Sequence, residues 1–243
     1  MKIIKLDAID STNTFLKELA YNTKLENFTV ATAKAQKKGR GQMGATWVSE
    51  PGENLLCSVY VAFDAFLVKD KVLINYAVSL AIVDILASLN VPRLAIKWPN
   101  DILSSGAKIS GILIENVMRG KEIESAIIGI GLNVNQITFP QHLNKVTSIR
   151  KEMSSRFNLD DLLVQFVIAL KKRILLRSSE DASSLKTLYL NWLYKKNIPT
   201  MFKDSSDVLF MGKIINVTSQ GKLQIELEDD SIQEFGIKEV SFA

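Results

Sequence analysis

The sequence contains one cysteine and one histidine among its 243 residues, and this scarcity excludes several kinds of chemistry. Cys57 alone can form neither an intramolecular disulfide nor a cysteine-clustered zinc site. Because Cys57 lies in an apolar stretch, we expect a buried thiol rather than a nucleophile. His142 lies in a polar stretch, and the sequence has no Gly-x-Ser-x-Gly elbow to accompany it in a hydrolase triad. We therefore interpret His142 as a surface or loop residue.

The sequence also has little excess charge and no obvious membrane or export signal. Its net charge of +4, with 23% charged and 47% hydrophobic residues, is typical of a globular protein and does not by itself indicate nucleic-acid binding. The N-terminus lacks the apolar core and cleavage site of a signal peptide. The longest apolar run, Val72–Val91, is interrupted by Asn75 and Asp84, which favours a buried helix over a membrane span. We expect a protein of the reducing cytoplasm.

Hydrophobic periodicity predicts an α+β fold, a mixed sheet with helices packed on one side. Many of the expected strands follow one another through hairpins, which argues against a doubly wound sheet. The expected strands are Lys2–Leu6, Phe28–Ala33, Leu55–Phe63, Arg93–Trp98, Lys108–Asn116 and Ser125–Asn135. The expected helices begin near Asp10 or span Val72–Leu89, Leu159–Leu176 and Ala182–Tyr194.

The pattern changes near Lys196–Pro199, where we place a domain boundary. Residues 1–196 then form the large domain and residues 197–243 a small C-terminal β-barrel. The barrel prediction depends on short alternating stretches separated by turn residues, namely Val208–Met211, Gly212–Val217, Leu223–Leu227 and Ile232–Gly236. In the large domain, Gln136–Arg156 is polar with little periodicity, which is typical of a mobile segment.

A glycine-rich basic loop, Lys37–Trp47, lies between two expected strands. Glycines let a ligand approach the main chain, and successive free N–H groups in such a loop can cradle an anion. Arg40 adds a forked cation suited to a carboxylate or a phosphate. An inert hairpin loop explains the same composition equally well, so the loop needs support from elsewhere in the chain.

That support comes from three further polar clusters, Ser11–Asn13, Lys97–Lys108 and Gly129–Asn133, which lie at the ends or connections of expected strands. No cluster offers paired histidines, a cysteine nucleophile or closely spaced carboxylates. The residues suit the binding and polarisation of an anion better than covalent or glycosidase-type catalysis.

Taken in order, the clusters resemble those of bacterial biotin protein ligases, the biotin–[acetyl-CoA-carboxylase] ligases, over essentially the whole chain. Each motif alone is a weak or moderate signal, but together at this spacing they are highly specific. The matching residues are Asp10-Ser11-Thr12-Asn13, Gly39-Arg40-Gly41 with Gly44 and Trp47, Lys97–Asp101, Lys108 with Gly111–Glu115, and Gly129–Asn133.

The resemblance implies a two-step reaction. Biotin and ATP, with the magnesium ion Mg2+, give biotinyl-5′-AMP and pyrophosphate. The biotinyl group then passes to one lysine of a biotin carboxyl carrier protein or domain belonging to a biotin-dependent carboxylase. A site rich in glycine and cations, with no nucleophile, fits this chemistry because a carboxylate must attack an already anionic phosphate.

The resemblance also implies roles for individual residues, with no protein ligands assigned to the metal. Ser11, Thr12 and Asn13 face the ureido ring, Lys108 contacts the activated carboxyl and phosphate oxygens, and Asp101 is a base or orienter for the incoming lysine. The implied catalytic residues are Lys108, Arg40 and Asp101. The implied binding residues are Ser11, Thr12, Asn13, Gln36, Gly39, Arg40, Gly41, Gln42, Trp47, Lys97, Asn100, Lys108, Gly111, Gly131 and Asn133.

Two departures from the family pattern stand out. The family loop often reads Gly-Arg-Gly-Arg-Arg-Gly-Arg, whereas Gln42, Met43 and Ala45 occupy the later arginine positions here. The charge expected of this loop therefore depends mainly on Arg40. The helix-turn-helix domain that some members use for DNA has no room before Asp10, so we expect no DNA binding and no repressor function.

Two alternatives remain open at this stage. A lipoate–protein ligase or related acyltransferase shares the expected fold, but its Arg-Arg loop, consecutive glycines and His-Asp pair are not visible here. A nucleic-acid-binding module is the alternative from another class, and the acidic C-terminal region with few aromatics argues against it. The resemblance leaves both a monomer and a homodimer open.

Overall fold

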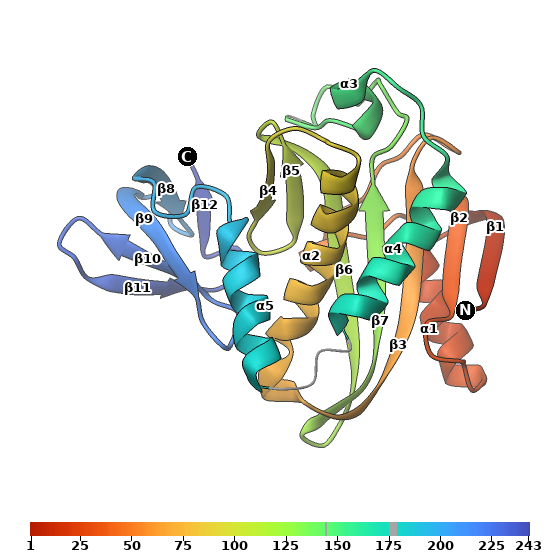
Figure 1. Ribbon diagram of the computed structural model, residues 1–243. Coiled ribbons are helices and arrows are strands. Elements are labelled where there is room, and N and C mark those ends of the chain that lie inside the picture. The colour runs from red at the N-terminus through yellow and green to blue at the C-terminus, as the bar shows by residue number, and fades with distance from the viewer. Residues whose placement is uncertain (144, 175–178) are drawn as a thin grey trace.

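The computed structural model describes residues 1–143, 145–174 and 179–243 (Figure 1). Seven of the described strands form one sheet in the order β1-β2-β3-β7-β6-β5-β4, with β1 and β2 parallel and the other neighbours antiparallel. The predicted mixed sheet is therefore confirmed. Its strands are β1 (Ile3–Ile9), β2 (Val30–Gln36), β3 (Leu55–Leu67), β4 (Leu94–Lys97), β5 (Asp101–Ser104), β6 (Ala107–Arg119) and β7 (Glu122–Leu132).

Strand β5 was not predicted, because only four residues separate the turn that precedes it from the turn that follows it. Its ladder partners lie in the strands immediately before and after it, and the four residues of β5 alone are too few to show a strand period. Ile102 pairs with Ile96 of β4 on one side and with Ser110 of β6 on the other. The pairing brings Asp101 opposite Lys97 and Gly111, which places the polar ends of these strands together.

Three helices, α2 (Val72–Ser88), α4 (Leu159–Ile174) and α5 (Ser179–Asn191), lie in front of the sheet in the view of Figure 1. Helix α1 (Thr12–Asn22) packs on the opposite face, where Leu16 meets Ala31 and Ile127 in a small separate core. The prediction of helices on one side was therefore wrong for α1. The last two residues of the predicted helix Leu159–Leu176 lie outside the described residues.

The two faces of the central strands follow the period of two that a strand imposes. On β7, Ile128 and Ile130 belong to the main core beneath α2 and α4, while Ile127 faces α1. The glycines at 129 and 131 share the α1 face with Ile127. One face of the sheet is thus filled with aliphatic side chains, and the other has room for a ligand.

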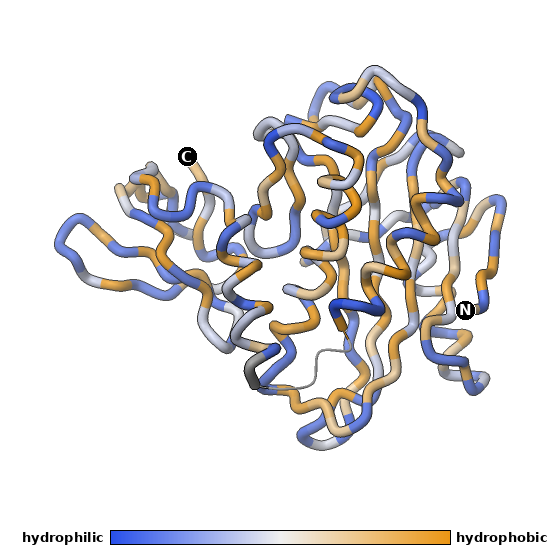
Figure 2. Tube along the Cα trace, in the orientation of Figure 1, coloured by the Kyte–Doolittle hydropathy of each residue, from blue (hydrophilic) through white to orange (hydrophobic). Residues whose placement is uncertain are grey.

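The longest apolar run of the sequence forms helix α2, which is mostly buried inside the fold. The segment Val68–Ser88 is long and apolar enough to cross one, yet 67% of its apolar window is buried inside the fold. Figure 2 shows α2 and the central strands as mostly hydrophobic. Its two interrupting polar residues have partners, since Asp84 pairs with Arg173 at 2.8 Å and Asn75 Nδ2 donates to the Pro99 carbonyl at 2.8 Å.

The polar segment 136–156 contains a short helix, α3 (Ile149–Met153), that was not predicted. Ser148 caps it by accepting a hydrogen bond from Lys151 N at 3.2 Å. Upstream of the helix, Thr147 N donates to the Lys108 carbonyl at 2.9 Å, and Lys108 N donates to the Lys145 carbonyl at 2.6 Å. Main-chain hydrogen bonds to β6 thus hold the described part of this segment against the sheet, and such bonds need no hydrophobic periodicity.

The C-terminal region forms the predicted small all-β unit. It is a five-stranded antiparallel sheet in the order β11-β10-β9-β8-β12. Phenylalanine rings from β8, β9 and β11 stack on one another, and the β12 ring lies tilted against the β8 ring. The ladder ends at β11 and β12, so hydrogen bonds among the described strands leave this barrel-like sheet open. Its strands are β8 (Thr200–Asp204), β9 (Leu209–Val217), β10 (Leu223–Leu227), β11 (Ile232–Phe235) and β12 (Val240–Phe242).

Candidate active site

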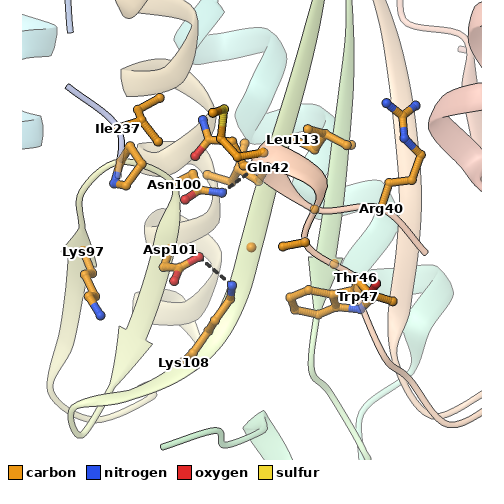
Figure 3. Close-up of a pocket in the computed structure, with 18 of the residues that line it drawn as sticks. Arg40, Gln42, Thr46, Trp47, Lys97, Asn100, Asp101, Lys108, Leu113 and Ile237 are labelled. Atoms are coloured by element: carbon orange, nitrogen blue, oxygen red, sulfur yellow. Dashed lines mark hydrogen bonds and ion pairs between the residues drawn. The ribbon is translucent and has the colours of Figure 1, made fainter. Parts of the chain in front are cut away.

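A cavity of about 430 Å³ lies between the glycine-rich loop, the β4–β5 turn, strands β6 and β7, and the C-terminal sheet (Figure 3). The structure brings most of the sequence-predicted site residues to this one cavity. Those that line it are Ser11, Thr12, Asn13, Gln36, Arg40, Gly41, Gln42, Trp47, Lys97, Asn100, Asp101, Lys108, Gly111 and Gly131.

The floor of the cavity consists of two glycines under a tryptophan. Gly111 of β6 and Gly131 of β7 are directly opposite in the ladder. A Cβ on Gly111 would lie 2.9 Å from the Trp47 ring, and one on Gly131 would overlap the indole. Only glycine at both positions lets the indole lie this close to the sheet. Strand periodicity places these two glycines on the α1 face, away from the aliphatic core.

The glycine-rich loop is closed by its own hydrogen bonds. Trp47 N donates to the Gly39 carbonyl at 3.0 Å, and Gly41 N donates to the Ala45 carbonyl at 2.7 Å. Between them the chain makes a 3₁₀ turn at Gln42–Gly44, where Gly44 has a φ of +80°. Gly39 supports the base of this hairpin and does not line the cavity.

Small polar side chains form one end of the cavity at the start of α1. Ser11 is the N-cap of the helix, and Thr12 N donates to Gln36 Oε1 at 2.7 Å. Ser58 Oγ donates to Asn13 Oδ1 at 2.6 Å and lies 2.8 Å from Thr12 Oγ1. Ser11, Thr12 and Asn13 are each 3% exposed, so this hydroxyl and amide cluster is buried. Sequence reasoning missed Ser58, because a serine inside an apolar strand carries no local signal of function.

The opposite end of the cavity is cationic. Lys108 Nζ pairs with Asp101 Oδ1 at 2.7 Å and lies 5.4 Å from the centre of the Trp47 ring. Asn100 fixes the turn before Asp101, since its Nδ2 donates to the Ile112 carbonyl at 2.9 Å and its own carbonyl accepts from Ile112 N at 3.0 Å. The Trp98–Pro99 peptide in this turn is cis.

Arg40 does not join Lys108 at this end. Its guanidinium binds both carboxylate oxygens of Glu115 at 3.2 Å and points away from Lys108 (Figure 3). Burial raises the pKa of Glu115, but the Asn13 hydrogen bond and the charges of Arg40 and Lys17 outweigh it and hold that pKa below its ordinary value. The loop cation is therefore held at the polar end of the cavity by a charged partner.

The C-terminal sheet supplies a wall of the cavity that the sequence did not predict. Lys238 Nζ donates to the Met43 carbonyl at 3.1 Å, which ties this wall to the glycine-rich loop. No local pattern marks these residues, because they meet the loop across almost the whole length of the chain. The C-terminal lining residues are Phe202, Leu223, Ile237, Lys238, Val240, Ser241 and Phe242.

Asn133 lies outside the cavity lining. Its Nδ2 donates to the Thr147 carbonyl at 3.0 Å and its N donates to the Ile109 carbonyl at 2.9 Å, so it anchors the chain after β7. Within the described parts of the chain, no group of three or more His, Cys, Asp or Glu residues is placed to hold a metal ion. Magnesium commonly keeps its waters and binds through substrate phosphates plus one or two carboxylates, and such a site needs no larger group.

Comparison with known proteins gives a consistent result. The model of the Biotin/lipoate A/B protein ligase family matches residues 6–133. The bifunctional ligase/repressor BirA of Bacillus subtilis is 30% identical over 242 residues, covering 98% of this chain and 71% of that protein. A biotin–[acetyl-CoA-carboxylase] ligase of Paracoccus denitrificans is 35% identical over 127 residues, covering 51% of each chain.

Solved structures agree on the fold. The biotin protein ligase from Aquifex aeolicus in complex with biotin and ATP superposes with a TM-score of 0.80 at 22% identity, covering 100% of this chain and 98% of that one. The Leishmania major enzyme in complex with biotinyl-5-AMP gives a TM-score of 0.64 at 22% identity, covering 97% and 98% of the two chains. The sequence-based resemblance is confirmed: the chain is a ligase and belongs to the biotin/lipoate A/B protein ligase family.

Proposed function

We propose that this ligase activates biotin with ATP to biotinyl-5′-AMP and transfers the biotinyl group to a lysine of a biotin carboxyl carrier protein, in the reducing cytoplasm. One observation carries the proposal: a single cavity joins a buried hydroxyl and amide cluster at one end to the Lys108–Asp101 pair at the other. This arrangement suits an elongated ligand with a hydrogen-bonding head and an anionic tail.

The polar end supports biotin over lipoate. Ser11, Thr12 and Asn13 are almost fully buried, and burying polar groups is costly unless they find hydrogen-bond partners. The ureido ring of biotin offers two N–H donors and a carbonyl acceptor to such a cluster. The dithiolane ring of lipoate offers neither, so it would add no hydrogen bond to this cluster and would set an apolar ring against buried polar groups.

The first step joins two anions. A biotin carboxylate oxygen attacks the α-phosphorus of ATP. The bond between the α-phosphorus and the oxygen that bridges to the β-phosphorus breaks, and pyrophosphate leaves with that oxygen. Magnesium bound to the triphosphate would lower its charge. We assign Lys108 to the point where the carboxyl and the phosphate would meet, because a fixed ammonium there would stabilise the charge that both bring. In this structure Asp101 holds the ammonium in place at 2.7 Å.

The second step needs a neutral amine. The acceptor lysine nitrogen attacks the biotinyl carbonyl carbon, an amide forms and AMP leaves with the bonding electrons. Asp101 is the carboxylate beside Lys108 at the reacting end, and it is 23% exposed. We propose that Asp101 orients the incoming ammonium and takes up its proton once Lys108 turns to the adenylate.

Incubation of the protein with ATP, magnesium, labelled biotin and a purified carrier domain tests the proposal. We expect the label to appear on the carrier and to disappear when the target lysine is changed to arginine. Lipoate is offered in a parallel reaction. Transfer of lipoate in place of biotin would favour the alternative ligase, and transfer of neither would reject the proposed function.

A further inference from the structure

Glu115 does not line the cavity, but it connects three elements that do: strand β6, the glycine-rich loop and the start of α1. It lies on β6, its side chain is 19% exposed, and its carboxylate receives Arg40 from the loop. The same carboxylate accepts a hydrogen bond from Asn13 Nδ2 at 3.0 Å and lies 3.7 Å from Lys17 Nζ. A half-buried carboxylate with this many donors stays ionised, consistent with its lowered pKa.

The surroundings of Asn13 fix which way its amide points. Two acceptors flank Nδ2, the Glu115 carboxylate at 3.0 Å and the Leu113 carbonyl at 3.3 Å. A hydroxyl donor, Ser58 Oγ, lies 2.6 Å from Oδ1. The reversed amide would set its oxygen against an ionised carboxylate and a carbonyl at once. The hydrogen bond to the ionised Glu115 carboxylate is charge-assisted and is the strongest of these contacts, so it determines the orientation of the Asn13 amide.

A fixed amide has a consequence for the ligand. Because both Nδ2 contacts are made within the protein, Asn13 offers the cavity an acceptor, Oδ1, with one lone pair on Ser58 and one left over. The neighbouring Gln36 Oε1 accepts from Thr12 N at 2.7 Å and leaves its NH₂ group as a donor. A head group that matches this pattern carries an N–H next to a carbonyl in one ring.

We infer that Glu115 is a positioning residue that holds Asn13 as a hydrogen-bond acceptor and thereby sets the preference of the cavity for a cyclic urea. The inference rests on the proposed function. A site built around a buried acceptor discriminates against a ligand without the matching donor, because the lone pair of Asn13 Oδ1 that Ser58 does not use then has no donor to pair with. Glu115 acts on the ligand only through Asn13.

The test is the affinity for biotin of a Glu115→Gln variant, measured by isothermal titration calorimetry. Glutamine keeps the size of the side chain, but its own amide can pair with Asn13 in either orientation. We expect biotin to bind about ten- to a hundredfold more weakly. The KM for biotin should rise likewise, while the KM for ATP stays within about twofold of wild type.

Two comparisons make the result specific. Glu53→Gln removes another half-buried carboxylate paired with an arginine, Arg156 at 2.7 Å, and should leave biotin affinity unchanged. In an Asn13→Ala background, Glu115→Gln should add little further loss, because its effect passes through Asn13. A full additional loss in that background would overturn the inference and assign Glu115 to loop structure alone.

The experiment distinguishes a failure of this inference from a failure of the proposed function. A wild-type protein that binds no biotin would reject the proposed function itself. A wild-type protein that binds biotin and a Glu115→Gln variant that binds it equally well would reject only the inference. If circular dichroism shows that the glutamine variant is unfolded, Glu115→Asp replaces it, since aspartate keeps the charge but draws the carboxylate back from Asn13.

Discussion

Lys108 carries its charge at the cavity wall beside Asp101 and the Trp47 ring. Because the side chains of Lys108 and Asp101 are both partly exposed, at 33% and 23%, water can solvate the carboxylate that remains when the ammonium is removed, and the fold should be little disturbed. We predict that Lys108→Ala slows adenylate formation by roughly 10²–10³-fold with little change in melting temperature. Single-turnover formation of biotinyl-AMP measures the rate. Lys121→Ala, at the exposed turn between β6 and β7, is the matched control; equal rates in both variants would remove Lys108 from the chemistry.

Arg40 is paired with Glu115 and not with Asp101, so it acts at the other end of the cavity from Lys108. The Glu115 pair keeps its guanidinium at the polar end of the cavity, 45% exposed. We predict that Arg40→Ala also slows adenylate formation more than it disturbs folding, because the loop loses the cation that its family pattern supplies several times over. The same single-turnover assay checks it, and a wild-type rate would return Arg40 to a purely structural role.

Cys57 is fully buried, and burial raises the pKa of its thiol to about 12. A thiol in that state is neither ionised nor accessible at neutral pH. We predict that a thiol reagent such as Ellman's reagent titrates almost no thiol in the native protein and one per chain in denaturant. Rapid labelling of the native protein would contradict the structure at the centre of the sheet.

Several site residues were predictable because their signals are local. Lys108 and Asp101 stand a hairpin apart in the sequence, so the turn between β5 and β6 suffices to bring them together. Ser58 and Glu115 were not predicted as site residues. Ser58 looks like an ordinary strand residue, and Glu115 belongs to the matched family motif but was given no role in the site. The contact of both with Asn13 depends on how β3 and β6 are placed around it.

At the scale of elements, the glycine-rich loop is a hairpin whose tip is exposed while its base is hydrogen-bonded. If it orders further over biotinyl-AMP, as lids over reactive intermediates do, the ligand should protect it. We predict that saturating biotin with ATP slows tryptic cleavage at Lys37, Lys38 and Arg40 by several-fold, measured by mass spectrometry of early fragments. Cleavage at the exposed Lys121 serves as the internal reference. Unchanged relative rates would count against ordering.

The contact between Lys238 and Met43 joins the C-terminal sheet to that loop with one hydrogen bond at 3.1 Å. Because it is exposed, it should contribute only about 1 kcal/mol to stability. We predict that Lys238→Met leaves the melting temperature nearly unchanged but makes tryptic cleavage at Arg40 faster in the unliganded protein. Lys203→Met changes a half-exposed lysine of the same sheet that pairs with Asp207 and should leave that cleavage rate as in wild type. Equal effects of the two substitutions would show that the Lys238–Met43 contact does not hold the loop.

Element prediction succeeded where periodicity extends over several turns or ladder pairs. Helices α2 and α4 were predictable from their apolar residues, which recur along one face of α4 and all round α2. Strand β5 and helix α3 span four and five residues, too few for a period to show. Both form because neighbours already in place offer them hydrogen bonds, which is tertiary information.

At the scale of the whole molecule, residues of both sheets line the cavity. The predicted boundary near Lys196–Pro199 assigned the site to residues 1–196, yet part of the wall comes from residues 237–242. Trp98 Nε1 donates to the Gly221 carbonyl at 3.0 Å, a second link across that boundary. Treating residues 197–243 as a separate domain remains a proposal; the chemistry as we propose it needs both parts.

The most direct test of the account is biotin-dependent exchange of labelled pyrophosphate into ATP, with no acceptor protein present. Reversible formation of biotinyl-AMP makes this exchange possible, and no other partner is needed. We predict exchange that requires both magnesium and biotin, is absent with lipoate in place of biotin, and falls at least a hundredfold in Lys108→Ala. Wild-type protein that gives no exchange with biotin, or equal exchange with lipoate, would contradict the account.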